Sequence, residues 1–255
     1  MKNPRTILIT GASSGIGEAL ALEYARPGIF LALSGRNAER LEAVADSCRD
    51  KGADVTCDIV DVADMHAMRN WITGIDEERS LDLVIANAGI AGDSGFKGAD
   101  LNEAVTRDIF AINMAGMLNT LFPVIEPMRK RGKGQLALVS SIAGFRGLPS
   151  APAYSTSKVM VKACGEALRG VLRKEGVEVS VICPGFVESR ITENNDFPMP
   201  FILKAPKAAK IIRKGLEKNK VLIAFPWPLV TVMRLLNLLP ASWTNRLLSS
   251  LPNKK

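Results

Sequence analysis

The sequence is poor in the residues that bind metals or build disulfide frameworks. It has one histidine, His66, and four cysteines with no C-x-x-C pairing in 255 residues. This spacing argues against a structural zinc site and favours four reduced thiols in a cytosolic protein. The first residues lead directly into a strand-like run without a long apolar core or a cleavage signal, so we expect no secretory leader.

Acidic residues are nearly absent from the last part of the chain. Residues 201–255 contain eleven Lys and Arg against Glu217 alone, a net charge of +10, whereas the whole chain carries +7. The basic character is therefore local and does not indicate a nucleic-acid-binding protein. A basic segment beside apolar residues can instead attract anionic surfaces.

Short apolar runs rich in β-branched residues alternate with longer amphipathic stretches. The composition, 47% hydrophobic and 23% charged, is that of a globular protein. Nearly continuous apolar strands are buried on both faces, as parallel sheets require. The sequence therefore predicts an α/β fold, a single doubly wound Rossmann-type parallel sheet with helices on both faces. We expect strands at 6–10, 29–34, 54–58, 81–86, 135–140 and 177–183, and helices near 16–25, 38–50, 62–79, 101–130 and 152–175.

Two prolines fall inside the longest predicted helix. Pro123 and Pro127 lie between residues 101 and 131, so we expect a kink or a break there. No repeat or long linker interrupts the chain, and we expect residues 1–255 to form one domain in which 190–255 make a variable substrate lid and an apolar C-terminal segment.

A glycine-rich turn follows the first predicted strand. Its sequence from Thr10 to Gly17 is TGASSGIG, and a helical pattern comes next. Glycines allow a tight turn and a close backbone approach to a pyrophosphate, while the helix N-terminus offers free amide groups. The turn predicts a dinucleotide site, although a tight structural turn would give the same pattern.

The second predicted strand ends without the carboxylate that would hold the 2′-hydroxyl of NAD. The chain has no acidic residue between Glu23 and Glu39, and Arg36 follows the strand. A guanidinium can bind a 2′-phosphate, so we expect NADP(H) to be preferred over NAD(H); the alternative is that Arg36 is a solvated turn residue. Asp58 and the segment Asn87-Ala88-Gly89 end the next two strands at the same edge.

Four polar residues are predicted to form a catalytic group. Tyr154 and Lys158 are four residues apart at the start of a helix, which places both on one face. A nearby cation, together with oxidised nicotinamide, is expected to favour the phenolate and lower the tyrosine pKa. Ser141 ends the fifth large strand, where its hydroxyl can donate to a carbonyl oxygen, and Asn113 lies in the preceding helix.

This ordered set resembles the short-chain dehydrogenase/reductase family across at least residues 5–190. The residues that carry the resemblance are TGASSGIG at 10–17, Asp58, Asn87-Ala88-Gly89, Asn113, Ser141, YSTSK at 154–158, and Pro184-Gly185-Phe186-Val187.

The resemblance implies a role for each catalytic residue. Tyr154 would be the general acid in reduction, Lys158 would hold the nicotinamide ribose and lower the tyrosine pKa, and Ser141 would orient the carbonyl. Asn113 would support a water-linked proton relay.

The resemblance also implies how the cofactor is held, and Pro184 to Ser189 would line the nicotinamide side. The cofactor-binding residues would be Gly11, Ser13, Ser14, Gly15, Ile16, Gly17, Arg36, Asp58, Ile59, Asn87, Ala88, Gly89, Tyr154, Lys158, Pro184, Gly185, Val187 and Ser189. Ala86 and Ser189 depart from the family pattern, which commonly has Asn and Thr there; the second keeps a hydroxyl.

The apolar segment 221–251 has two interpretations. Only Arg234 and Arg246 are charged in it, and three prolines interrupt it, so it should not span a bilayer. It can pack as a lid and an oligomer interface. Alternatively, Trp and Leu side chains enter a membrane interface while basic residues meet anionic lipid, namely Lys204, Lys207, Lys210, Arg213 and Lys214.

We therefore expect an NADP(H)-dependent enzyme that interconverts a ketone or aldehyde and an alcohol. We expect a small-molecule substrate, with a lipid-like or long-chain compound as one candidate, and we expect neither a metal nor a nucleic acid to take part. The family resemblance implies a homodimer or homotetramer. We place the protein in the cytoplasm, with possible peripheral contact at the inner face of a membrane. The alternative function is a catalytically silent NADP-binding regulator or scaffold on the same fold.

Overall fold

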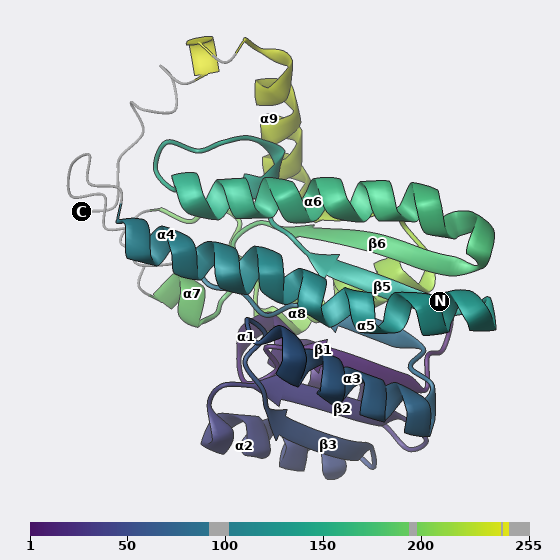
Figure 1. Ribbon diagram of the computed structural model, residues 1–255. Coiled ribbons are helices and arrows are strands. Elements are labelled where there is room, and N and C mark those ends of the chain that lie inside the picture. Colours follow the sequence, from purple (N-terminus) through teal and green to yellow (C-terminus); the bar gives the residue numbers. More distant parts are fainter. Residues whose placement is uncertain (92–101, 194–197, 241, 245–255) are drawn as a thin grey trace.

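Strands and helices alternate along the chain. The computed structural model describes residues 1–91, 102–193, 198–240 and 242–244 (Figure 1). The elements are β1 (Thr6–Thr10), α1 (Gly15–Tyr24), β2 (Phe30–Gly35), α2 (Ala38–Arg49), β3 (Asp54–Ile59), α3 (Met65–Arg79), β4 (Leu83–Ala86), α4 (Glu103–Phe110), η1 (Ala111–Ala115), α5 (Gly116–Arg131), β5 (Gly134–Val139), η2 (Ile142–Phe145), α6 (Pro152–Leu172), η3 (Arg173–Glu175), β6 (Val177–Pro184), α7 (Arg190–Glu193), α8 (Ala205–Glu217), β7 (Leu222–Phe225) and α9 (Trp227–Leu238).

The strands form one seven-stranded sheet in the order β3-β2-β1-β4-β5-β6-β7. All neighbouring strands are parallel, and Ile7, for example, lies opposite Leu31 on one side and Leu83 on the other. The order reverses between β1 and β4, which is where doubly wound sheets bind ligands. The predicted fold class is confirmed, and the six predicted strands lie within two residues of the observed ones at each end.

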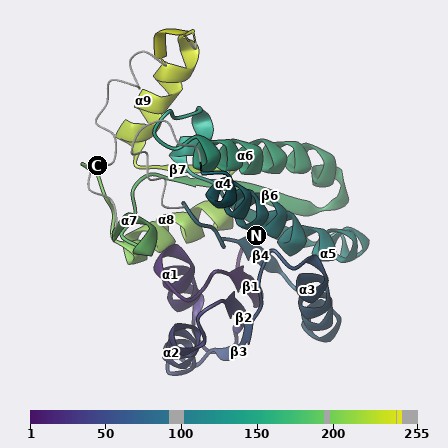
Figure 2. The ribbon, with the colours of Figure 1, turned by 60° about the vertical axis from the view of Figure 1, so that its left-hand side comes forward.

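Helices cover both faces of the sheet (Figure 2). On one face, buried side chains of α1, α2 and α8 pack against residues such as Ile7, Ile9 and Leu31. On the other, side chains of α3, α5 and α6 pack against Leu8 and Val84. Because neighbouring strand residues point to opposite faces, each buried strand supplies both layers of the core.

The long central helix does not break at its prolines. It runs from α4 through η1 into α5, and Pro123 and Pro127 lie inside α5. The predicted break is therefore wrong, because Leu121, Val124 and Met128 pack into the core and hold this stretch helical. The kink, the other expected outcome, stays a prediction. Residues 103–131 are long and apolar enough to cross a membrane by composition alone, and this packing against the sheet accounts for much of their apolar character.

Part of the expected lid belongs to the sheet and its helix layer. Helix α8 packs beside α1, where Arg213 Nε lies 2.8 Å from Glu23 Oε1, and β7 adds a strand that the sequence did not reveal. Residues 194–197, 241 and 245–255 of the expected lid and C-terminal segment lie outside the described residues. Helix α9 stands away from the other helices at the top of Figure 1, and the same is seen in Figure 2.

Candidate active site

The glycine-rich turn links β1 to the N-terminus of α1. Gly11 and Gly15 have left-handed backbone conformations, with φ of 66° and 61°. A Cβ on Gly17 would come within 2.2 Å of the Gly11 carbonyl oxygen, so that position requires glycine. Ser14 precedes α1 and its side chain makes no capping hydrogen bond, which leaves the first-turn amides available. A glycine cradle and open amides at the positive end of a helix fit the pyrophosphate of a dinucleotide.

Asn87 fixes this turn to the end of β4. Its side-chain amide donates to the carbonyl oxygens of Thr10, at 3.0 Å, and Gly11, at 3.1 Å. The backbone N–H groups of Asn87 and Ala88 donate to the Thr10 hydroxyl oxygen. Asn87 and Ala88 therefore shape the cradle itself, at the point where β1 and β4 diverge.

The adenosine side of the candidate site lies beyond β2 and β3. Arg36 is exposed immediately after β2. The Asp58 carboxylate accepts a hydrogen bond of 2.8 Å from Trp71 Nε1 on α3, and Ile59 is exposed beside it. Trp71 was not predicted, because no sequence pattern relates a helix residue to the end of the preceding strand.

A hollow of about 740 Å³ opens on the side of the glycine turn that faces the segment after β6. It is lined by Ser13, Ser14, Gly15, Arg40, Ser189 and Arg190, among others. A Cβ on Gly15 would lie 2.9 Å from Ser189 Cβ, so the two predicted cofactor segments meet here. The predicted catalytic residues do not line this hollow.

Tyr154, Lys158 and Ser141 come together at the carboxyl end of β5. Tyr154 and Lys158 lie in the first turns of α6, with Lys158 Nζ 5.6 Å from the centre of the tyrosine ring. Ser141 precedes η2, where its hydroxyl oxygen accepts from the Ala143 N–H at 3.1 Å, and its side chain is hydrogen-bonded to Tyr154. The arrangement places a phenol, a hydroxyl and an amine around one point.

Asn113 lies in the irregular turn η1, where its side chain bonds two other segments of the chain. This turn is π-helical, a geometry that is common at functional sites. Asn113 Oδ1 accepts from the Ile90 N–H at 2.8 Å, and its Nδ2 donates to the Ile90 carbonyl and to Ser157 Oγ. Both hydrogens of the side-chain amide are thereby used, so Asn113 ties the segment after β4 to α6. Its role in a proton relay stays a prediction.

Gly89, in the segment after β4, lies next to both Asn113 and Lys158. A Cβ at this glycine would lie 3.1 Å from Asn113 Oδ1 and 3.3 Å from Lys158 Nζ. Lys158 Nζ also donates to the Val139 carbonyl at 3.1 Å. The ammonium group is therefore held between the ends of β4 and β5, next to the segment that includes Asn87 and Ala88.

Burial shifts the pKa values of Tyr154 and Lys158, the predicted catalytic pair. It raises the pKa of Tyr154, against the smaller lowering effect of the Ser141 hydrogen bond. It lowers the pKa of Lys158 from 10.5 to about 8. The lowered tyrosine pKa expected from the sequence is not produced by the protein groups alone, because loss of hydration outweighs them. Tyr154 is protonated at neutral pH and can donate a proton.

The segment after β6 closes the site. The Gly185 N–H donates to the Phe225 carbonyl at 2.7 Å, and Val187 is buried and bridges to Leu203. The Ser189 N–H donates to Thr192 Oγ1. The segment from Pro184 to Ser189 thus runs from the catalytic end of β6 to the glycine turn.

All four cysteines are free thiols. Among the described residues, no three or more His, Cys, Asp or Glu side chains are grouped so that they could hold a metal ion.

Several known proteins are similar to this chain over most of its length. A family model described as short chain dehydrogenase matches residues 5–198. An uncharacterized oxidoreductase of Myxococcus xanthus is 40% identical over 237 residues, which cover 92% of this chain and 93% of the relative. A protein of Arabidopsis thaliana named 11-beta-hydroxysteroid dehydrogenase-like 4A is 33% identical over 234 residues, which cover 88% and 77%.

Solved structures share the fold. A short-chain dehydrogenase from Sphingobium yanoikuyae in complex with NADPH has a TM-score of 0.80 and 24% identity, covering 98% of this chain and 97% of its own. A short-chain dehydrogenase/reductase from Burkholderia phymatum in complex with NAD has a TM-score of 0.81 and 23% identity, covering 91% and 92%. At these identities the likeness concerns the fold.

Proposed function

Because the chain belongs to the short-chain dehydrogenase family and is an oxidoreductase of that family, we propose that it is an NADP(H)-dependent enzyme that interconverts a ketone or aldehyde and an alcohol. The observation that carries the proposal is the convergence of Tyr154, Ser141 and Lys158 beside Gly89, at the sheet edge that holds the glycine cradle.

Each of these side chains has a role in reduction that follows from its environment. When bound, NADPH supplies the hydride. Protonated Tyr154 donates its proton to the carbonyl oxygen, so that one hydride and one proton convert the ketone to the alcohol. The Ser141 hydroxyl donates a hydrogen bond to that oxygen as negative charge develops. Lys158, as a cation, stabilises the phenolate that remains and can hold the nicotinamide ribose.

Substitution of Tyr154 by Phe tests the chemistry and distinguishes the enzyme from a silent NADP-binding protein. We expect Tyr154→Phe to lower kcat with a panel of ketones by about a hundred- to ten-thousandfold, because the proton donor is lost. NADPH binding, measured by fluorescence titration, should change little. Tyr24→Phe, at the other tyrosine of the chain, is the matched control. Equal activity of Tyr154→Phe and the wild type would remove Tyr154 from the mechanism.

The proposed preference for NADP(H) is supported by Arg36 and by the lack of a carboxylate at the end of β2. We expect Arg36→Ala to raise the KM for NADPH by about ten- to a hundredfold, since a hydrogen bond between charged groups contributes about 1.5–3 kcal/mol. The KM for NADH should be unchanged. Arg69→Ala, at an exposed arginine of α3, is the control. A parallel rise for both cofactors would contradict phosphate recognition by Arg36.

The proposed substrate is apolar and bulky. Helix α9 lies against η2, next to Ser141, and Leu229 of α9 and the preceding Pro226 lie beside Gly185 at the end of β6. A lid of this composition favours a lipid-like or long-chain ketone over a polar one. The names of two relatives, the Arabidopsis thaliana protein and 17-beta-hydroxysteroid dehydrogenase 13 of Mus musculus at 29% identity, support the same class.

We further propose that the protein is cytoplasmic and forms a homodimer or homotetramer. The family resemblance supports the assembly, and the four free thiols are compatible with a reducing compartment. The molar mass in solution would decide the number of subunits.

A further inference from the structure

Helix α9 is attached to the body of the protein along one side. Val230 is buried there, and a Cβ on Gly185 would lie 3.2 Å from Leu229 Cδ1. Arg146 Nη1 donates to the carbonyl oxygens of Leu236, at 2.9 Å, and Leu239, at 3.3 Å. A cation that binds the last carbonyls of a helix stabilises its C-terminus. These contacts hold α9 in a fixed position against the rest of the protein.

The opposite side of α9 is also apolar but exposed. Trp227 and Leu238 are 78% and 80% exposed, and Trp243, shortly after the helix, is 68% exposed. Val232 and Leu235 of α9 are also exposed, at 52% and 58%. We call these five residues the α9 face. An exposed apolar patch of this kind marks an interaction surface.

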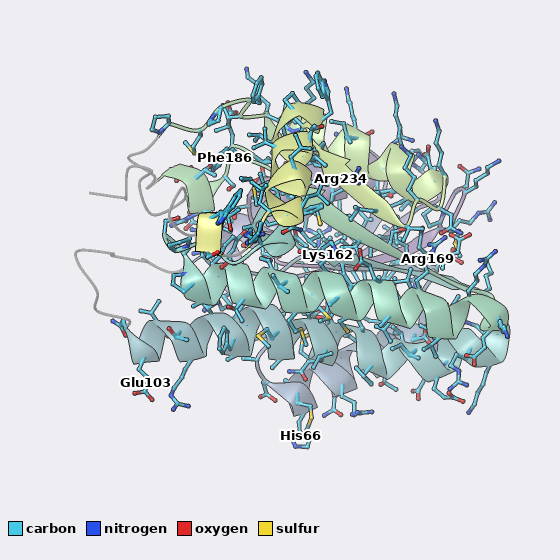
Figure 3. All side chains as sticks on the ribbon, turned by 90° about the horizontal axis from the view of Figure 1, so that it is seen from above. His66, Glu103, Lys162, Arg169, Phe186 and Arg234 are labelled. Carbon is cyan, nitrogen blue, oxygen red and sulfur yellow. The ribbon has the colours of Figure 1, made fainter. Side chains whose placement is uncertain are left out.

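The chemistry of the α9 face favours lipid as its partner. Tryptophan is enriched where membrane meets water, and the exposed apolar residues include Trp227 at the start of α9 and Trp243 five residues after its end. From Pro226 to Lys255 the chain has four basic residues, Arg234, Arg246, Lys254 and Lys255, and no acidic residue. Arg234 lies on α9 itself (Figure 3). Positive charge beside apolar side chains complements an anionic bilayer surface.

A membrane-spanning helix and a two-fold dimer through the α9 face both fit the structure less well. Helix α9 has 12 residues, which corresponds to a length of about 18 Å, too short for a hydrocarbon core of about 30 Å, so it would lie in the interface. A second copy paired through the same face would have no acidic partner for Arg234, because the described residues 226–240 and 242–244 contain no Asp or Glu.

We propose that the α9 face docks the protein on anionic lipid bilayers, with α9 lying in the plane of the interface. The lysines of α8 considered from the sequence are not needed, because α8 and α9 lie in different parts of the molecule (Figure 2). Since α9 contacts η2, docking brings the catalytic end of the sheet close to the lipid. The proposal stands independently of the reaction that the protein catalyses.

Vesicle binding tests the proposal without any measurement of activity. We expect the wild type to co-sediment with vesicles of phosphatidylcholine containing about 30% phosphatidylglycerol, more weakly with phosphatidylcholine alone, and less as salt is raised. Tryptophan emission should shift to shorter wavelength on binding. The double variant Leu235→Gln with Leu238→Gln should bind at least about tenfold more weakly, because two apolar anchors are lost while helix propensity is kept.

The control is Met65→Gln, at an exposed apolar residue of α3. Figure 3 shows the adjacent His66 and Arg234 of α9 on different sides of the molecule. Circular dichroism and thermal melting would show that both variants remain folded. Failure of the wild type to bind anionic vesicles overturns the proposal. So does a dimer that the Leu235→Gln and Leu238→Gln pair dissociates, because a second copy would then cover the α9 face.

Discussion

Burial acts in opposite directions on Tyr154 and Lys158 because they are charged in opposite protonation states. Loss of hydration disfavours the phenolate, which raises the tyrosine pKa, and disfavours the ammonium group, which lowers the lysine pKa to about 8. The Ser141 hydrogen bond only partly opposes the first effect. The residue types were predictable from the sequence. The direction of the tyrosine shift was not, because it depends on how completely the side chain is enclosed.

The lowered pKa of Lys158 predicts a specific pH dependence of stability. Between about pH 8 and 10.5 the unfolded chain binds more protons at this lysine than the folded protein does, so its contribution to the free energy of unfolding rises with pH. Below pH 8 the full cost of the buried charge is present. Lys158→Met should therefore stabilise the protein by roughly 2–3 kcal/mol at pH 7, with a smaller gain at pH 10. Urea denaturation at both pH values measures the difference.

Lys162→Met is the control for this measurement, because Lys162 is ion-paired with Glu166 on the surface of α6. Its effect should be small, because a partly exposed ion pair contributes little to stability. A gain for Lys158→Met that did not change between pH 7 and pH 10 would show that burial does not destabilise the ammonium group.

At the scale of elements, tertiary packing decides where the long central helix departs from α-helical geometry. The sequence pointed to Pro123 and Pro127, yet α5 continues through both, and the deviation from α-helical geometry lies at η1. The core side chains around the prolines hold the helix in place. At η1, the side chain of Asn113 binds Ile90 and Ser157 instead. No local sequence signal distinguishes these two outcomes.

Two glycines of α6 differ in whether tertiary packing leaves room for a side chain. Gly170 has open space where a Cβ would lie, whereas a Cβ on Gly165 would come within 2.5 Å of Val181 Cγ2. Alanine favours a helix by about 1 kcal/mol over glycine, so Gly170→Ala should stabilise the protein by about 0.5–1 kcal/mol. Gly165→Ala should destabilise it by about 1–3 kcal/mol, because overpacking exceeds the gain in propensity. Thermal melting compares them, and stabilisation by both would mean that α6 moves freely away from β6.

At the scale of the whole molecule, the carboxyl ends of the strands carry the candidate site, whereas the opposite end of the sheet carries contacts that stabilise the fold. The carboxyl ends of β1, β4, β5 and β6 carry the candidate site. Near the start of β4, Arg131 of α5 binds Asp76 of α3 through two contacts of 2.7 and 2.9 Å, and also the Leu81 carbonyl. Asp76 is only 6% exposed and also accepts from the Leu81 N–H. This end therefore joins helices to the sheet.

This division predicts that Arg131→Met affects stability and not catalysis. It leaves the Asp76 carboxylate buried without its partner, so the free energy of unfolding should fall by about 3 kcal/mol. The values of kcat and KM at 25 °C should stay within about twofold of the wild type. Arg107→Met, which breaks an exposed pair with Glu103, should cost about 0.5 kcal/mol or less. A marked loss of kcat in folded Arg131→Met protein would contradict the separation of the two ends.

The sequence by itself determined the parallel sheet through β6 and the glycine cradle, and it predicted the residues that meet at the candidate site. These features rest on local patterns, namely apolar runs, a glycine turn and the four-residue spacing of a helix. Only the tertiary structure decided the seventh strand, the pairing of Trp71 with Asp58, the burial that sets the pKa of Tyr154, and the exposed side of α9. Each of these depends on which distant segments pack together, and no local pattern along the chain specifies that contact.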